Sequence, residues 1–287
     1  MAATSGNWAY ETDVVVVGSG AGALTAAVRA RDLGLEVLVI EKTGQYGGSS
    51  AMSGGVLWLP NSPLVAGAGG SDSLEEGKRY LKSVVGEPHL EKRIDAYVEQ
   101  IPTFIDFLHR NTHLRLAPLP QFPDMYPDNP DAKMHRCHEA VPFHARALPD
   151  EEVLNLRPQH PQTALFGLIG WTPSESLILQ ARGEGWLKVA ISMVARYLLD
   201  IPWRFRSLRD RRLVLGGALV GALRHSMLDR GIPLWLNSPF EDFIEEDGRV
   251  AGVLARHDGV RARILARKGV ILAAGGFEKN NALRQQH

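Results

Sequence analysis

A glycine-rich turn near the start of the chain constrains its fold more than any other feature. Four consecutive valines are followed directly by the hexapeptide Gly18-Ser19-Gly20-Ala21-Gly22-Ala23. Residues 13–17 form a continuous β-branched run, which predicts a parallel strand buried on both faces. Residues 21–33 predict a helix that ends before Gly34, and residues 35–40 predict a second strand. This order of elements is that of a βαβ unit, so we expect an α/β fold with a parallel sheet and flanking helices.

The glycine turn matches the G-x-G-x-x-G/A fingerprint of dinucleotide-binding proteins, and it has the required strand before it and helix after it. Gly18 permits the tight turn, Gly20 lets the backbone approach a pyrophosphate, and Ala23 permits close packing of helix against strand. The helix N-terminus would face the anion. Glu41 follows the second strand, where a carboxylate can bind ribose hydroxyls and repel a 2′-phosphate. We therefore expect an adenine dinucleotide other than NADP.

Two further glycine clusters favour FAD over NAD. They are Gly47-Gly48-Ser49-Ser50 and Ser53-Gly54-Gly55, and both follow the ribose-binding strand directly. Additional backbone and hydroxyl donors there suit an extended cofactor, although a flexible surface loop has the same composition. Ala273-Ala274-Gly275-Gly276, after the last strand, is a weaker third candidate. The residues expected at the cofactor are Gly18, Gly20, Ala21, Gly22, Ala23, Glu41, Lys42, Gly47, Gly48, Ser49, Ser50, Ser53, Gly54, Gly55, Phe240, Ala274 and Gly275.

The remainder of the chain predicts mixed elements. Ser73 followed by Glu76 forms a capping-box pattern before a helix. The other elements expected are a helix over 90–108, an irregular stretch over 111–161, a helix ending at 231, a strand over 232–236, a β-meander over 240–245, 249–256 and 262–267, and a last strand over 270–274.

Charge and cysteine usage exclude several classes of protein. The chain has 32 basic and 32 acidic residues, and this balance argues against a nucleic-acid-binding protein. Its longest nearly uncharged apolar run, 213–223, is too short to cross a bilayer, so no integral membrane association is expected. The N-terminal residues lack the pattern of a signal peptide, which predicts a cytoplasmic protein. Cys137 is the single cysteine and fits a reducing compartment.

Three weaker signals have ordinary interpretations. His135, Cys137 and His138 match no common zinc spacing, so no metal site is expected. Arginines 204, 206, 209, 211 and 212 predict a solvated face, with an anionic membrane surface as the alternative. A set of apolar residues is expected in the core, with a substrate entrance as the alternative: Phe122, Met125, Phe143, Phe166 and Trp171.

Several segments resemble the fumarate reductase and succinate dehydrogenase flavoprotein superfamily, and within it the 3-ketosteroid Δ1-dehydrogenases. The segments are 14–41, 46–61, 125–127, 142–146, 231–237, 247–250 and 273–278. The resemblance implies a Rossmann-type FAD-binding domain over 13–287, after a tail over 1–12 and with an irregular insertion over about 111–171. It also implies that the catalytic cap domain, with the principal base, lies beyond His287. Met52 and Val56 replace Arg and Gly that are typical of the family.

The resemblance implies an FAD-dependent oxidoreductase that acts on CH–CH donors. Hydride would leave a carbon of a 3-oxo steroid ring for flavin N5, while a base removes the neighbouring proton. By this resemblance, Tyr126 is expected to be a catalytic residue that supports that base. The implied partners are an apolar, steroid-like substrate and an electron acceptor that the sequence does not identify. Two alternatives stay open: a catalytically silent flavin-binding fragment, and a fumarate reductase-like enzyme that acts on a small dicarboxylate.

Overall fold

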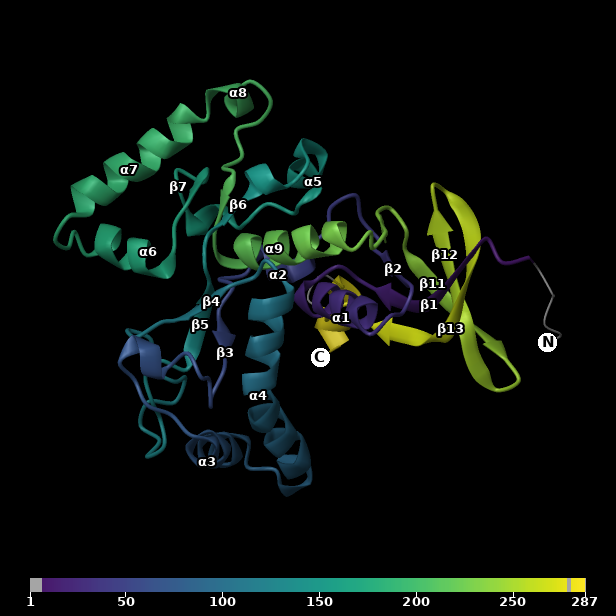
Figure 1. Ribbon diagram of the computed structural model, residues 1–287, viewed down its shortest axis with the longest axis horizontal. Coiled ribbons are helices and arrows are strands. Elements are labelled where there is room, and N and C mark those ends of the chain that lie inside the picture. Colours follow the sequence, from purple (N-terminus) through teal and green to yellow (C-terminus); the bar gives the residue numbers. More distant parts are fainter. Residues whose placement is uncertain (1–6, 278–279, 287) are drawn as a thin grey trace. The chain divides into compact units, whose positions relative to one another are not determined.

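The computed structural model describes residues 7–277 and 280–286 (Figure 1). Its backbone contacts divide the chain into two compact units. The first, called the sheet unit below, takes its residues from Met1–Met52, Ala145–Gln159 and Val220–His287. The second, called the helical unit, takes its residues from Ser53–His144 and His160–Leu219.

A six-stranded sheet organises the sheet unit, with strand order β10-β2-β1-β13-β12-β11. The first four of these strands run parallel to one another, and β12 and β11 continue the sheet as an antiparallel meander. This mixed sheet confirms the α/β class. The strands are β1 (Tyr10–Val17), β2 (Val37–Ile40), β10 (Leu234–Trp235), β11 (Phe240–Glu246), β12 (Arg249–His257) and β13 (Val260–Leu272).

The valine run of β1 lies at the centre of this sheet and is buried on both faces. Val15 and Val17 pack on one face in a cluster that includes Leu38 and Ile264. Strand alternation directs Val14 and Val16 to the other face. There α1 (Ala21–Asp32) contacts β1 and β2 with its buried small and aliphatic residues. Burial of one valine side chain contributes about 1.5 kcal/mol or more, so the run anchors the whole unit.

The strands in the C-terminal part of the chain differ from the prediction in two respects. The segments 262–267 and 270–274, predicted as separate strands, belong to one strand of 13 residues, β13. The pairing of β1 with β13 shifts register between Thr12 and Val14, opposite Gly269, whose φ is 149°. Strand β13 therefore continues in the same sheet on both sides of this irregularity. The strand predicted over 232–236 is shorter, because β10 pairs with β2 only at Leu234 and Trp235.

The helical unit contains a small three-stranded sheet, in the order β3-β5-β4, and several of the helices (Figure 1). Ser73 Oγ accepts a hydrogen bond from the Glu76 amide at 3.3 Å, which confirms the predicted cap of α3. The strands of this unit are β3 (Leu57–Trp58), β4 (Leu116–Pro118), β5 (Cys137–Ala140), β6 (Phe143–His144), β7 (Ala164–Leu165), β8 (Ile169–Gly170) and β9 (Arg212–Leu213). Its α-helices are α3 (Leu74–Val85), α4 (Glu91–Asn111), α6 (Pro173–Gln180), α7 (Trp186–Leu199) and α8 (Ile201–Arg204).

Four further α-helices lie among the described residues. Helix α9 (Leu215–Asp229) buries Leu219, Leu223 and Met227, as their spacing predicts, and contributes residues to both units. The other three are α2 (Gly48–Met52), α5 (Asp150–Asn155) and α10 (Asn281–Gln286). Among the described residues, no helix combines the length and the apolar character needed to cross a bilayer.

Two expectations about side chains are corrected. Met125 and Phe166 are largely exposed, so they do not belong to the core. Arg211 and Arg212 do not form a solvated face, because each is partly buried and paired with an acid. Arg212 binds both carboxylate oxygens of Glu175, at 2.9 and 3.0 Å, and Arg211 does the same with Asp200.

Candidate functional site

The carboxyl ends of three neighbouring parallel strands meet at one edge of the large sheet. The glycine turn follows β1, Glu41 follows β2, and the Ala273–Gly276 segment follows β13. Because β1 lies between β2 and β13, this edge is a topological switch point, where α/β proteins bind ligands. A cavity of about 520 Å³ opens there, lined by Gly18, Ser19, Gly20, Ala21, Gly22, Ala23, Glu41, Lys42, Thr43, Gly48, Ser49, Ser50, Arg157, Ala273, Ala274, Gly275 and Gly276.

Gly18 permits the turn at the end of β1 for two reasons. Its φ is 104°, which side-chain-bearing residues rarely adopt. A Cβ atom at this position would lie 2.4 Å from the carbonyl oxygen of Ala273, on the neighbouring strand. The turn can therefore pass beside the end of β13 only with glycine at position 18.

The N-terminus of α1 provides the positive end of the site. Its N-cap residue, Gly20, makes no side-chain cap, and the first turn holds no acidic residue. Ser50 Oγ accepts a hydrogen bond from the amide of Ala21, the first residue of the helix, at 3.1 Å. Amide groups and the helix dipole at this end favour an anionic ligand such as a pyrophosphate.

Glu41 is buried and held in place by hydrogen bonds. One carboxylate oxygen accepts a hydrogen bond from Ser19 Oγ at 2.5 Å, and the other accepts bonds from the amide and hydroxyl of Thr43 at 3.0 and 3.1 Å. Ser19 Oγ also accepts a bond from the Gly47 amide at 3.1 Å. The carboxylate is thus fixed at the cavity wall by both the fingerprint turn and the segment after β2, where it can accept further bonds from ribose hydroxyls.

Arg157 is a cavity residue that the sequence did not indicate. Its backbone is fixed against Tyr46, whose carbonyl accepts the Arg157 amide at 2.9 Å, and its Nη2 donates to Thr43 Oγ1 at 3.1 Å. Its Nε is buried and has no hydrogen-bond partner among the described residues. A buried donor without a partner is uncommon in native proteins. A cationic donor beside a helix N-terminus fits the phosphates and polar groups of an adenine dinucleotide.

Most of the predicted cofactor residues line this cavity. Gly47 does not: its φ is 107°, and a Cβ there would lie 2.7 Å from that of Ala51, so packing alone requires glycine. Phe240 is also absent from the lining and packs edge-on against Phe243 in the core of the sheet. Their contact with a cofactor stays a prediction.

The cluster Ser53-Gly54-Gly55 belongs to the helical unit. Gly55 has φ of 62°, and a Cβ there would lie 2.3 Å from the Leu215 backbone. The Ser53 carbonyl accepts the amide of Gly216 at 3.1 Å. These contacts explain the glycine at position 55 by backbone packing, and a role of the cluster at a cofactor stays a prediction.

Other polar residues of the cavity were not predicted from the sequence. Ser19 and Thr43 hold Glu41, and their position within or directly after the motif was an available signal. No comparable signal existed for Arg157, because it lies more than a hundred residues from Glu41 and has no motif around it.

Tyr126 lies in the helical unit and its side chain is 60% exposed. Its amide donates to the phenol oxygen of Tyr80 at 3.1 Å. Burial raises the pKa of Tyr80, so this phenol stays neutral. The Arg136 guanidinium lies over the Tyr80 ring, 5.4 Å from its centroid. The backbone of the Tyr126 segment is therefore held by buried residues, while its side chain reaches the surface of the unit.

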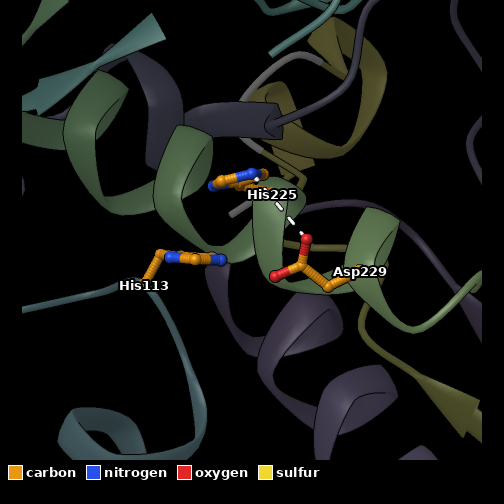
Figure 2. Close-up of side chains that lie close together, drawn as sticks. All are labelled: His113, His225 and Asp229. Carbon is orange, nitrogen blue, oxygen red and sulfur yellow. Dashed lines mark ion pairs between the residues drawn. The ribbon is translucent and has the colours of Figure 1, made fainter. Parts of the chain in front are cut away.

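Two groups of possible metal ligands have protein partners. The His138 ring is buried, with its nitrogens 2.8 Å from Ser62 Oγ and 2.9 Å from the Arg136 carbonyl. On α9, His225 Nε2 lies 3.8 Å from Asp229 Oδ1, one helical turn away (Figure 2). Two ligands on one helix are too few to define a metal centre.

The parallel sheet, the fingerprint turn and the fixed carboxylate after β2 define a dinucleotide-binding protein of the Rossmann type. The chain belongs to the FAD binding domain family, whose model matches residues 13–287, in the fumarate reductase and succinate dehydrogenase flavoprotein superfamily.

Its relatives include several dehydrogenases. It is 36% identical over 279 residues to 3-oxosteroid 1-dehydrogenase of Comamonas testosteroni, an alignment that covers 96% of this chain and 48% of that protein. It is 31% identical to 4-oxocyclohex-2-ene-1-carboxylate 5-dehydrogenase of Sinomonas cyclohexanicum, over 96% of this chain and 46% of that protein. The crystal structure of 3-ketosteroid Δ1-dehydrogenase from Sterolibacterium denitrificans, in complex with 1,4-androstadiene-3,17-dione, matches with a TM-score of 0.90 and 42% identity, over 96% of this chain and 50% of that one. The chain spans about half the length of these relatives.

Proposed function

We propose that this chain forms the FAD-binding part of a dehydrogenase that oxidises a CH–CH bond next to a ring ketone, with a 3-oxo steroid as substrate. One observation carries the proposal: the chain aligns over 96% of its length with dehydrogenases named for ring substrates that bear an oxo group. The cavity after β1, β2 and β13 supports the cofactor assignment.

The residues of the cavity have distinct tasks in this proposal. The N-terminus of α1 binds the pyrophosphate, Glu41 binds the ribose of the adenosine half, and Arg157 donates to the same half. When bound, FAD supplies the hydride acceptor for the reaction. Lys42 adds a second positive charge at the adenosine end.

Tyr126 supports the base that removes the proton next to the ketone. A phenol O–H can donate a hydrogen bond to that base and orient it, which is a supporting role. Tyr80 fixes the Tyr126 backbone and keeps this donor in position.

A smaller cyclic oxo acid is the second candidate substrate. The 31% identity to the 4-oxocyclohex-2-ene-1-carboxylate 5-dehydrogenase favours it, because that substrate shares the ring ketone and lacks the fused rings of a steroid.

Spectroscopy and turnover test the function on the protein expressed from its complete reading frame. We expect yellow protein that absorbs near 450 nm and reduces an artificial acceptor with a 3-oxo steroid. Turnover of a cyclic oxo acid but not of steroid favours the second candidate, and turnover of succinate alone contradicts both. Bound FAD without turnover of any of the three contradicts the proposed activity and leaves the cofactor assignment intact.

Replacing Tyr126 by Phe is expected to lower turnover about a hundredfold and to leave the flavin content unchanged, because general acid–base groups contribute factors of this order. The measurement is kcat together with the ratio of flavin to protein. Tyr97→Phe is the control, since Tyr97 is a second half-exposed tyrosine of the helical unit. Equal kcat for Tyr126→Phe and wild type would contradict the assignment.

Replacing Arg157 by Met is expected to weaken FAD binding about tenfold, because a charged donor to the cofactor is lost. The Kd is measured by titration of apoprotein with FAD. Arg157→Lys should retain part of the affinity. Arg249→Met, an exposed arginine on β12, serves as the control. An unchanged Kd in Arg157→Met would remove Arg157 from the cofactor site.

A further inference from the structure

Helices α7 and α8 carry an exposed apolar surface within the helical unit. Met193 and Tyr197 of α7 are buried in a cluster with Ile169, and Val189 packs against the same cluster. The opposite side of the helix is also apolar. Its residues, with those of α8 and the next turn, define the α7–α8 apolar face: Leu187, Ile191, Leu198, Leu199, Ile201 and Phe205.

The spacing within α7 makes this face a stripe. Leu187, Ile191 and Leu198 are four and seven residues apart, so they lie on one side of the helix. Ile191 is 66% exposed, Leu199 74% and Phe205 88%. Large apolar residues that gather on an exposed surface mark an interaction site more often than scattered ones do.

The turn after α8 is held in place by hydrogen bonds. Trp203 Nε1 donates to the Arg209 carbonyl at 2.7 Å, and the Tyr197 hydroxyl donates to the Leu208 carbonyl at 2.7 Å. Arg204 lies over the Tyr197 ring, 4.0 Å from its centroid. Phe205 is therefore presented on a fixed turn and is not the end of a frayed helix.

The surroundings of the face are basic. Residues 181–212 contain eight basic and three acidic residues, and two of the basic residues, Arg211 and Arg212, are paired with Asp200 and Glu175. Lys188 on α7 and Arg206 on the turn after α8 are exposed, and Arg196 is exposed but pairs with Glu175 at 3.6 Å. Two of the three acids do not offset them at the face: Asp200 is buried against Arg211, and Asp210 is partly buried. An apolar face with a basic border complements an anionic lipid surface.

We propose that the α7–α8 apolar face docks on the surface of an anionic lipid bilayer, with its apolar residues in the interface and Lys188 and Arg206 toward the headgroups. Helix α7, with 14 residues, is about 21 Å long and lies in the plane of the interface, because it is too short to span the bilayer. A second copy of the chain fits this face less well, because its basic border would oppose another one. The proposal does not depend on the proposed function.

Vesicle flotation of the protein expressed from its complete reading frame tests this docking. We expect binding to phosphatidylcholine vesicles that contain about 30% phosphatidylglycerol. Binding should be about tenfold weaker at about 0.5 M salt, or when the anionic lipid is left out. The combined variant Ile191→Ser, Leu198→Ser and Phe205→Ser should lose at least about tenfold in binding. Lys188→Glu with Arg206→Glu should lose the salt-sensitive part. The control is Leu33→Ser with Val260→Ser, two exposed residues of the sheet unit.

A local probe keeps the test independent of these variants' stability. Cys137 is buried, so a polarity-sensitive dye on Ile191→Cys labels the face selectively. We expect its emission to shift to the blue with anionic vesicles. An unshifted dye with no flotation overturns the proposal, as does flotation that the control variant loses equally. If the protein does not float but forms a dimer, and the serine variant dissociates that dimer, the face binds a second copy of the chain. That result also overturns the proposal.

Discussion

Replacing Gly18 by Ala is expected to abolish FAD binding and to lower the free energy of unfolding of the sheet unit by about 3 kcal/mol. Two costs combine at this position. The φ of 104° is strained for alanine, and the new Cβ would lie 2.4 Å from the Ala273 carbonyl oxygen. That carbonyl cannot retreat freely, because the Ala273 amide donates to Val17 at 2.9 Å. Relief would require β1 and β13 to part at the edge where the cofactor cavity opens.

Gly22→Ala is the matched control for the effect of Gly18→Ala on stability, and not for FAD binding, because Gly22 also lines the cavity. Gly22 lies in the same motif but within α1, and a Cβ there would meet no atom within 4 Å. Alanine in a helix is favoured over glycine by about 1 kcal/mol, so we expect unchanged or slightly higher stability. The measurements are urea unfolding of the apoprotein and the Kd for FAD. If Gly18→Ala bound FAD like the wild type, the turn would not have the role assigned to it.

Replacing Arg136 by Met is expected to destabilise the helical unit by about 3–5 kcal/mol, the range for one partner lost from a buried ion pair. The Arg136, Asp72 and Asp124 side chains are fully buried. Arg136 binds both oxygens of Asp72, at 2.7 and 2.9 Å, and one oxygen of Asp124 at 2.7 Å. Methionine fills much of the volume but leaves two buried carboxylates without a counterion.

Arg79→Met is the control for this prediction. Arg79 pairs with Asp131 on the same unit, but its side chain is 56% exposed, and such pairs contribute at most about 1 kcal/mol. Tryptophan fluorescence during urea unfolding is a suitable measurement, because Trp58 Nε1 donates to Asp124 at 2.7 Å. Equal destabilisation by both variants would show that the buried charges are dispensable.

The Arg136 variant also bears on function. The guanidinium covers Tyr80, and Tyr80 accepts the Tyr126 amide. Turnover should therefore fall further than flavin content, because the residues that line the proposed cofactor cavity belong to the other unit. A parallel loss of both would indicate general unfolding.

Local sequence signals were sufficient to predict an element where residues adjacent in the chain determine its structure. The valine run, the glycine turn and the cap at Ser73 each predicted an element that the structure contains. These signals failed where contacts with other segments of the chain determine the structure. Gly269 interrupts the apolar pattern, and only pairing with β1 shows that β13 continues through it. The solvated face expected for Arg211 and Arg212 was wrong because Asp200 and Glu175, which lie outside the arginine run, bind them.

The sequence by itself determined the class of fold and indicated the core of the candidate cofactor site. A β-branched run, a glycine turn and an acid after the next strand are local, and their geometry follows from strand, turn and helix rules alone. Only the tertiary structure decided that Arg157 lines the cavity, that Arg136 neutralises two buried acids, and that one side of α7 stays exposed. Each of these depends on contacts between residues far apart in the chain, and residue type and spacing do not specify such contacts.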